Sequence, residues 1–491
     1  MTIQTSSFLL IVVLSIIINI HGRPTFLLTR GGEGKSIRKS DAYYPLAVAL
    51  KSRVEVTDIK LLEKTLKSLS TTQKAFKGLD GAAHEAYQRT FSSFSNNELT
   101  SVVGRARRSA SRTASTADAF LTAELCELVE RDQYIENSHS EDGALWNRQI
   151  LLKTNVRLTK GSNVTVLVLW EPSYDGGAGV NHGGIKDLAR TTSKEKKGRF
   201  LVILKDSANN DLKETFDILD SEPLEVELKS GLVANEIASV QIHLYRCAGR
   251  VLREIRPLMS DEKLINKTKA AFHFVGQSLG GGVASLAAVI LDGSLPMPQV
   301  RKQQRKNKSD ADRVDGNITT LNLDGWGRGR SSATVLGSPP SLSANVKAAF
   351  IKSIIYGDDV ICRTTQKSLE RLCQRTRRFM KGSLLGRNLD WMTDAASLTI
   401  TNVKYHARGS DGEETRLVVP GQAFLIRPRR LRGVCSMHEV GCSKGGREAL
   451  RSAILWQLND ILLSESCWKH HQLKAYIEGL DKVQLRGAGN I

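Results

Sequence analysis

Residues 271–286 read AFHFVGQSLGGGVASL, an apolar run that stops at a Gly-x-Ser-x-Gly pentapeptide and continues as small residues with helical spacing. The pattern predicts a strand, a sharp turn centred on Ser278 and a helix. In such a turn the serine hydroxyl projects above the sheet edge, where the N–H of Leu279 and the helix N-terminus favour negative charge. We interpret Ser278 as a candidate nucleophile. The alternative is a tight strand-to-helix turn in which the serine has no catalytic role.

Further apolar runs extend this pattern to a whole domain. Residues 163–170 and 199–204 read as strands, and helical stretches such as 236–255 lie between the strands. Alternating strands and helices are typical of an α/β domain with a largely parallel sheet. Catalytic groups of such a domain belong at the carboxyl ends of its strands.

The N-terminus carries a possible targeting segment. Residues 8–20 read FLLIVVLSIIINI, a length that fits a signal-peptide core better than a membrane span of about 20 residues. Basic residues follow this run and none precedes it, an asymmetry that also fits an uncleaved anchor. A buried N-terminal helix or strand is the third interpretation. We expect residues 1–22 to be a signal peptide or signal anchor, and the protein to enter the secretory pathway or associate with a membrane.

Residues 41–140 form a predicted helical N-terminal region. Apolar residues recur every three or four positions between 59 and 69, with lysines between them. This helix packs on the core or lays its basic face on a membrane surface. Residues 104–116 are rich in Arg and Ser, which predicts a solvated linker.

Composition restricts the function classes without choosing among them. The chain has 491 residues, 41% of them hydrophobic, as is ordinary for a globular protein. An excess of 70 Lys and Arg over 51 Asp and Glu gives a net charge of +19, which attracts lipid headgroups or nucleic acid. No nucleic-acid-binding motif accompanies this charge, so no nucleic-acid partner is expected. The seven cysteines include no C-x-x-C pair, and neither a zinc site nor a metal cofactor is predicted.

A basic, polar insertion occupies residues 300–331. Its composition predicts a surface loop directly before a strand-like run at 333–336. The loop is either a lid beside the site, with Trp326 as an apolar contact, or a disordered surface insertion without a role at the site.

A nucleophilic serine needs a histidine to take its proton and a carboxylate to orient the imidazole, in the chain order Ser, Asp or Glu, His. Residues 348–357 read as a strand that ends in Asp358 and Asp359. We favour Asp359 as the carboxylate that orients the histidine, with Asp358 as the alternative. A purely structural interpretation is that the two aspartates cap the loop after the strand. The late histidines in question are His406, His438, His470 and His471.

The chain also resembles a known family. VGQSLGGGVASL at 275–286 resembles the GHSLGGAxAxL motif of class 3 (fungal-type) lipases. LGSPPSLS at 336–343 and SIIYGDDVICR at 353–363 resemble segments of the sn-1-specific diacylglycerol lipase branch. By this resemblance Asp359 completes the triad, and residues 150–491 form an α/β-hydrolase-like domain.

The resemblance also selects the remaining site residues. Residues 462–480 are similar to the family segment LxDHxxxxYxxxL, whose histidine matches His471, while His470 stands in place of the usual Asp. His438 is the reserve. The family's RGT turn matches Lys205-Asp206-Ser207, so Ser207 would be the second oxyanion donor beside the N–H of Leu279.

Three departures from the family pattern stand out. Gln277 replaces a histidine, Cys362 replaces a proline, and the VHxG segment matches 228–231 without its histidine. The first two positions do no chemistry in the family, whereas the third lies in the oxyanion region.

The resemblance implies a serine acylhydrolase that cleaves diacylglycerol or triacylglycerol at a membrane or lipid-droplet surface, with no cofactor. The basic charge favours an anionic membrane surface as partner. The competing hypothesis is a catalytically inactive lipase-like protein that acts as a basic membrane-surface binding module. The oligomeric state does not follow from the sequence.

Overall fold

The computed structural model describes residues 42–71, 116, 118–129, 149–171, 198–206, 211–228, 236–259, 271–298, 329–346, 348–381, 417–428, 435–440, 458, 461 and 463–488. The apolar run 8–20, the linker up to residue 115, Ser207, His406 and most of the insertion 300–331 lie outside the described residues.

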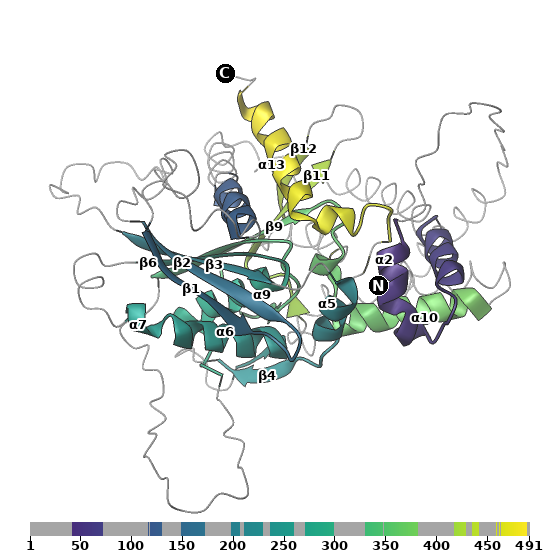
Figure 1. The fold of residues 1–491 in the computed structure, drawn as a ribbon, viewed down its shortest axis with the longest axis horizontal. Helices are drawn as coiled ribbons and strands as arrows, with labels where there is room; N and C mark the ends of the chain where they lie inside the picture. The colour runs from purple at the N-terminus through teal and green to yellow at the C-terminus, as the bar shows by residue number, and fades with distance from the viewer. Residues whose placement is uncertain are drawn as a thin grey trace, which may run out of the picture.

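The centre of the molecule is an eight-stranded sheet in the order β1-β2-β3-β6-β7-β9-β11-β12 (Figure 1). Its strands are β1 (Gln149–Arg157), β2 (Asn163–Glu171), β3 (Arg199–Asp206), β6 (Ala271–Gln277), β7 (Ser331–Leu336), β9 (Ile351–Tyr356), β11 (Gln422–Pro428) and β12 (Cys435–Val440). The strands from β3 to β11 are parallel, while β1, β2 and β12 join antiparallel at the two edges. The predicted α/β class with a mostly parallel sheet is confirmed.

All of the strands expected in the main sheet form, as β2, β3, β6, β7 and β9, whereas β1, β11 and β12 were not predicted. Strand β1 was not predicted, because its outer positions are exposed and its apolar pattern is weak. Residues 236–255 do not form one helical stretch, because Ile237–Val240 is strand β5 and the helix α6 covers only Ile242–Glu254. Gln241 separates the two elements: its side chain accepts a hydrogen bond from the backbone N–H of Leu244 and so caps the helix.

A second, four-stranded sheet has the order β10-β8-β5-β4. Its strands are β4 (Leu224–Glu227), β5, β8 (Leu342–Ser343) and β10 (Leu417–Val418). Strand β8 follows β7 closely in the chain, so this small sheet adjoins the same end of the main sheet that carries the candidate site.

Helices cover both faces of the main sheet (Figure 1). On one face lie α6 and α9 (Ser278–Leu291), and Phe272 and Phe274 of β6 are buried in the same cluster as the apolar side chains of these helices. On the other face, Val275 packs with Leu125 from a helix over residues 118–129. The C-terminal helix α13 (Leu473–Ala488) packs on this second face, against β9, β11 and β12. Alternate β6 side chains thus enter two separate apolar layers.

The N-terminal helices share the main core. Helix α2 (Tyr44–Val54) and the helix over residues 59–71 bury their apolar side chains with those of α5 (Leu212–Leu219) and α10 (Gln366–Lys381). Arg53 pairs with Asp217 and Asp220 across this contact. The apolar face predicted between residues 59 and 69 is therefore buried in the protein. The described part of the chain contains no helix whose length and apolar composition suit a bilayer crossing.

The remaining short elements are the helix α7 (Arg256–Met259) and two 3-10 turns, η2 (Ile361–Arg363) and η3 (Lys469–His471). Turn η2 follows β9, and η3 precedes α13. Each carries or adjoins one of the candidate site residues.

Candidate active site

Ser278 lies at a strained turn between β6 and α9. Its φ of 56° is in the left-handed region, which is uncommon for a residue with a side chain and costs free energy. Gln277, directly before it, is extended, and the helix begins at Ser278 itself. This is the strand-turn-helix geometry that the Gly-x-Ser-x-Gly motif predicts.

The two glycines of the motif leave room for the turn. A Cβ on Gly276 would lie 2.7 Å from the carbonyl oxygen of Gly280, and one on Gly280 would lie 2.3 Å from that of Leu204. Both contacts are with backbone atoms, which cannot move aside cheaply. The end of β3 therefore passes directly against the first turn of α9.

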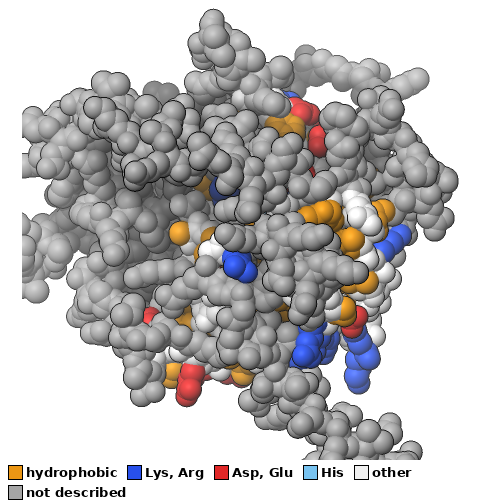
Figure 2. Space-filling model, turned by 90° about the vertical axis from the view of Figure 1, so that its left-hand side faces the viewer, with side chains coloured by type: hydrophobic (Ala, Val, Ile, Leu, Met, Phe, Trp, Pro, Cys, Tyr) orange, Lys and Arg blue, Asp and Glu red, His pale blue; other side chains and the backbone are white. Residues whose placement is uncertain are grey.

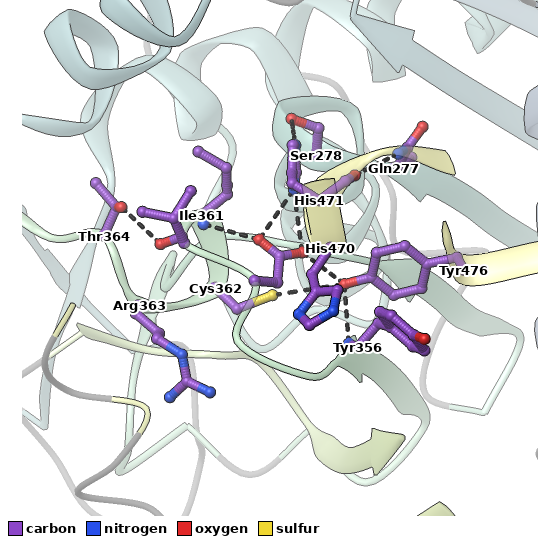
Figure 3. A network of polar contacts seen from close by, with 12 residues as sticks. Gln277, Ser278, Tyr356, Ile361, Cys362, Arg363, Thr364, His470, His471 and Tyr476 are labelled. Carbon is purple, nitrogen blue, oxygen red and sulfur yellow. Dashed lines mark hydrogen bonds and ion pairs between the residues drawn. The ribbon is translucent and has the colours of Figure 1, made fainter. Parts of the chain in front are cut away.

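His471 contacts Ser278 from a distant part of the chain. Its Nε2 lies 3.0 Å from the Ser278 Oγ, a hydrogen-bond distance between residues 193 positions apart. Figure 3 shows a dashed line that joins the imidazole of His471 to the Ser278 hydroxyl. The geometry lets Nε2 accept the hydroxyl proton.

Asp359 holds the other side of this imidazole. The His471 Nδ1 lies 3.0 Å from both carboxylate oxygens of Asp359. Ser278, Asp359 and His471 are 6%, 0% and 4% exposed, so the network is shielded from water. Burial alone raises the pKa of Asp359, but the charge and hydrogen bond of His471, with hydrogen bonds from Tyr476 and Ile361, outweigh it and lower this pKa below its ordinary value.

Tyr476 is a further member of the network that the sequence analysis did not assign to the site. Its hydroxyl donates to Asp359 Oδ2 over 2.6 Å and accepts from the backbone N–H of Tyr356 over 3.2 Å. Burial and the charge of Asp359 raise the pKa of Tyr476 well above its ordinary value, so the hydroxyl remains a donor. The sequence signal was present, since this tyrosine marks the segment that selected His471.

Asp358 and His470, the neighbours of the two triad candidates, have a different contact. The backbone N–H of Asp358 donates to His470 Nδ1 over 3.0 Å, and the His470 ring meets Tyr356 edge-on at 4.9 Å. Burial lowers the pKa of His470 and favours the neutral ring that this acceptor role requires. The structure thus brings Asp359 and His471 to Ser278 and gives their neighbours a contact behind the site.

Gln277 joins three parts of the site. Its side-chain amide donates to the backbone carbonyl of His471 over 3.1 Å, and its Oε1 accepts from the ammonium of Lys205. Trp468 stacks on the His471 ring with centroids 5.4 Å apart. Gln277 therefore connects β3, the turn at Ser278 and η3.

Gly337, at the end of β7, gives space to the same network. Its φ is 59°, and a Cβ there would lie 2.9 Å from Asp359 Oδ2 and 3.2 Å from His471 Nδ1. Glycine is the residue that fits both the backbone conformation and the space.

Asp206 brings a second carboxyl group to the nucleophile. It is the last residue of β3 and is half-buried, and it directly follows Lys205, which lies opposite Gln277 in the parallel register of β3 and β6. Burial raises its pKa, against the opposing effects of Lys205, His471 and Ser278. The sequence analysis quoted Asp206 only as the middle of the KDS turn.

The oxyanion region is described in part. Leu279 follows Ser278 in the first turn of α9, where backbone N–H groups have no partner within the helix. Ser207, the expected second donor, lies outside the described residues, as does the 229–231 part of the VHxG-like segment. His438 lies in β12, but its side chain is not among those described. Within the described residues, no three or more His, Cys, Asp or Glu side chains form a group that would hold a metal ion.

No family model and no curated protein sequence matches the chain. Solved structures similar to it include a propeptide complex of the Rhizomucor miehei lipase, with 11% identity, 71% of this chain and 78% of that chain covered, and a TM-score of 0.35. A triacylglycerol lipase from Penicillium expansum is similar at 13% identity, with 72% and 97% covered and a TM-score of 0.34. A lipase from Rhizopus microsporus var. chinensis is similar at 12% identity, with 50% and 68% covered and a TM-score of 0.29. The fold therefore rests on the order and direction of the strands, and the candidate chemistry rests on the contacts of Ser278.

Proposed function

We propose that this chain is a serine acylhydrolase that cleaves ester bonds of glycerolipids through an acyl-enzyme on Ser278. One observation carries the proposal: the Ser278 Oγ, the His471 imidazole and the Asp359 carboxylate form one continuous hydrogen-bonded series with contacts of 3.0 Å. A nucleophile, a base and an orienting acid in this arrangement are suited to acyl transfer.

The first half of the reaction uses all three groups. The Ser278 Oγ attacks the ester carbonyl carbon while its proton passes to His471 Nε2, and Asp359 stabilises the imidazolium that forms. The bond between the carbonyl carbon and the glycerol oxygen then breaks, and the departing alcohol takes the proton from Nε2. The fatty acyl group is left on Ser278.

The second half returns the enzyme to its starting state. Water gives a proton to His471 Nε2 and attacks the acyl carbon, and the Ser278 oxygen leaves and recovers that proton. The oxyanion that forms in each half is stabilised by the N–H of Leu279 and, in our proposal, by Ser207. No step requires a cofactor.

The substrate class rests on the sequence resemblance to the diacylglycerol lipase branch. We propose diacylglycerol or triacylglycerol at a membrane or lipid-droplet surface, with delivery through the secretory pathway or membrane attachment by residues 1–22. The net charge of +19 favours docking to anionic lipid at low salt. Figure 2 shows the described Lys and Arg side chains of one face in separate groups, with no continuous basic patch among the described residues there.

A second candidate function is favoured by the carboxyl group at the nucleophile. An ionised Asp206 beside Ser278 opposes the negative charge that develops during acyl transfer. A lipase-like protein with this feature can act as a basic membrane-surface binding module without catalysis.

Activity-based labelling separates the two functions. Wild type, Ser278→Ala, His471→Ala and Asp359→Ala are treated with a serine-reactive phosphonate and with diacylglycerol, and the lipid products are read by mass spectrometry. We expect labelling and fatty-acid release in wild type, and loss of both in Ser278→Ala. Labelling that persists in Ser278→Ala overturns the site assignment, and absence of Ser278-dependent chemistry in wild type favours the binding module.

A further inference from the structure

The N-terminal helix over residues 59–71 contacts the segment that leads to His471. Near the end of this helix, the Ser70 Oγ donates to the backbone carbonyl of Leu463 over 2.8 Å, across 393 residues of sequence. Ser70 is 1% exposed and Leu463 is 5% exposed, so the hydrogen bond is shielded from water. The N-terminal helical region and the chain that enters η3 are therefore joined directly.

Residues 463–468 form turns and irregular chain, in contrast to the strands that precede the other two triad candidates. Their backbone hydrogen bonds are local: the N–H of Cys467 donates to the carbonyl of Ser464 over 3.2 Å, and that of His471 donates to Trp468 over 3.0 Å. Local bonds fix the shape of a segment but not its place on the sheet. That place must come from contacts with other elements.

One side of the segment is held by the loop after β9 and by the turn at Ser278. The backbone N–H of Val360, the neighbour of Asp359, donates to the carbonyl of Cys467 over 3.2 Å. Gln277 donates to the carbonyl of His471 over 3.1 Å. Both contacts lie in the later part of the segment, so its beginning is held elsewhere, by helix 59–71.

Apolar packing repeats the connection that the hydrogen bond makes. The apolar side chains of helix 59–71 in the main buried cluster are Leu62, Leu66 and Leu69. Leu463 and Cys467 belong to the same cluster, and Trp468 packs against it. Trp468 in turn stacks on the His471 ring, with centroids 5.4 Å apart. A shift of the helix would therefore reach the imidazole by two routes.

We infer that helix 59–71 is part of the active-site scaffold and that Ser70 is a positioning residue, which keeps His471 within reach of Ser278 through its hydrogen bond to Leu463. This inference rests on the proposed function and deepens it, because it gives the N-terminal region a role at the same site. The catalytic unit then includes this helix in addition to the predicted domain 150–491.

The geometry of the triad explains why such a distant contact matters. Ser278 and Asp359 follow strands β6 and β9, so the main sheet positions both, whereas His471 depends on the segment that Ser70 holds. The contact between His471 Nε2 and the Ser278 Oγ is 3.0 Å. A displacement of about 1 Å caused far from the reacting atoms can slow a reaction about 100-fold. Because Val360 and Gln277 still hold the later part of the segment, we expect a smaller effect from the loss of Ser70 alone.

The test compares Ser70→Ala with wild type in phosphonate labelling. The saturating rate and the half-saturating concentration are measured separately, together with the thermal unfolding midpoint. We expect the saturating rate to fall about tenfold and the half-saturating concentration to stay unchanged, because the variant displaces His471 and leaves the nucleophile turn in place.

Ser331→Ala is the matched control. The Ser331 Oγ is also buried and donates to a backbone carbonyl, that of Ala288, over 3.0 Å, at the start of β7. It should lower the unfolding midpoint as Ser70→Ala does and keep the wild-type labelling rate. Equal labelling rates in the two variants overturn the inference, since they show that the Ser70 hydrogen bond contributes stability alone. If Ser70→Ala does not fold, Ser70→Cys, whose thiol is a weaker donor, takes its place with the same expectation.

A readout that needs no activity separates this inference from the proposed function. The proton that His471 Nδ1 holds against the Asp359 carboxylate should give a far-downfield proton NMR signal, which His471→Ala identifies by its loss. We expect this signal to shift or broaden in Ser70→Ala and to stay unchanged in Ser331→Ala. An unchanged signal in Ser70→Ala overturns the inference even if labelling depends on Ser278. Labelling that persists in Ser278→Ala overturns the proposed function, while the signal still reports whether Ser70 positions His471.

Discussion

The Tyr476 hydroxyl donates a hydrogen bond of 2.6 Å to Asp359 Oδ2 across 117 residues of sequence. Both side chains are fully buried, and the same hydroxyl accepts the backbone N–H of Tyr356 at the end of β9. Helix α13 therefore positions Asp359 through Tyr476, while η3, directly before this helix, carries His471.

Tyr476→Phe should weaken the site while keeping the packing of the ring. The change removes a hydrogen bond to a charged group, which contributes about 2 kcal/mol to the free energy of unfolding. It also leaves Asp359 less stabilised as the anion, so phosphonate labelling should slow about tenfold. Tyr245→Phe is the control, since it loses a 2.5 Å bond to the carbonyl of Pro296 away from the triad. Equal labelling by the two variants would contradict the assigned role.

Gly337→Ala should separate backbone strain from the crowding of the triad. The left-handed φ of 59° costs a non-glycine residue about 1 kcal/mol, and the new methyl group would lie 2.9 Å from Asp359 Oδ2. We expect labelling to fall at least about tenfold, because the contact between Asp359 and His471 must lengthen. Gly293→Ala has a comparable φ of 84° with nothing within 4 Å of the new Cβ, so it should lose stability alone. Normal labelling by Gly337→Ala would show that the site accommodates the methyl group.

The buried Asp359 should make the free energy of unfolding depend on pH in the acidic range. Its folded pKa is lowered, so its ionised form contributes stability above the unfolded pKa of about 4, and this contribution is lost as pH falls through the lower folded value. The difference in free energy of unfolding between wild type and Asp359→Asn should therefore be constant near neutrality and shrink below about pH 4. Denaturant unfolding across this range measures it.

Asp58→Asn is the control for that experiment. The Asp58 carboxylate accepts from the backbone N–H of Lys60 at a helix N-terminus, a role that asparagine fills equally well. Its free energy of unfolding should stay close to that of wild type at neutral pH, because asparagine keeps the hydrogen bond to Lys60. A constant difference for Asp359→Asn would mean that the Asp359 carboxylate is not stabilised as the anion.

Gln277→Leu should disturb the position of His471 without touching a reacting atom. The variant removes the donor to the His471 carbonyl and the acceptor for Lys205, and we expect a loss of about 1 kcal/mol in stability together with slower labelling. Gln241→Leu removes a buried glutamine that also donates to a carbonyl, that of Ile218, and accepts from a backbone N–H. If Gln241→Leu lowers stability as much as Gln277→Leu but leaves the labelling rate unchanged, the slower labelling of Gln277→Leu is due to the displaced His471.

Local sequence patterns predicted the elements around the nucleophile well. The apolar run, the glycines and the small residues of 271–286 determine a strand, a left-handed serine and a helix, because backbone sterics act over a few residues. The same reasoning failed at Ile237–Val240, where a short strand precedes α6 and its apolar residues also fit a helical period.

The sequence by itself determined the α/β class, the nucleophile turn and the order in which serine, acid and histidine follow one another. It offered adjacent pairs of the same type, Asp358 with Asp359 and His470 with His471, between which only the family resemblance chose Asp359 and His471. The tertiary structure brings Asp359 and His471 together at Ser278, and it alone shows that Tyr476 and Gln277 join them. The reason is physical: these contacts span up to 194 residues, and they form where the carboxyl ends of β3, β6, β7 and β9 come together at one edge of the sheet.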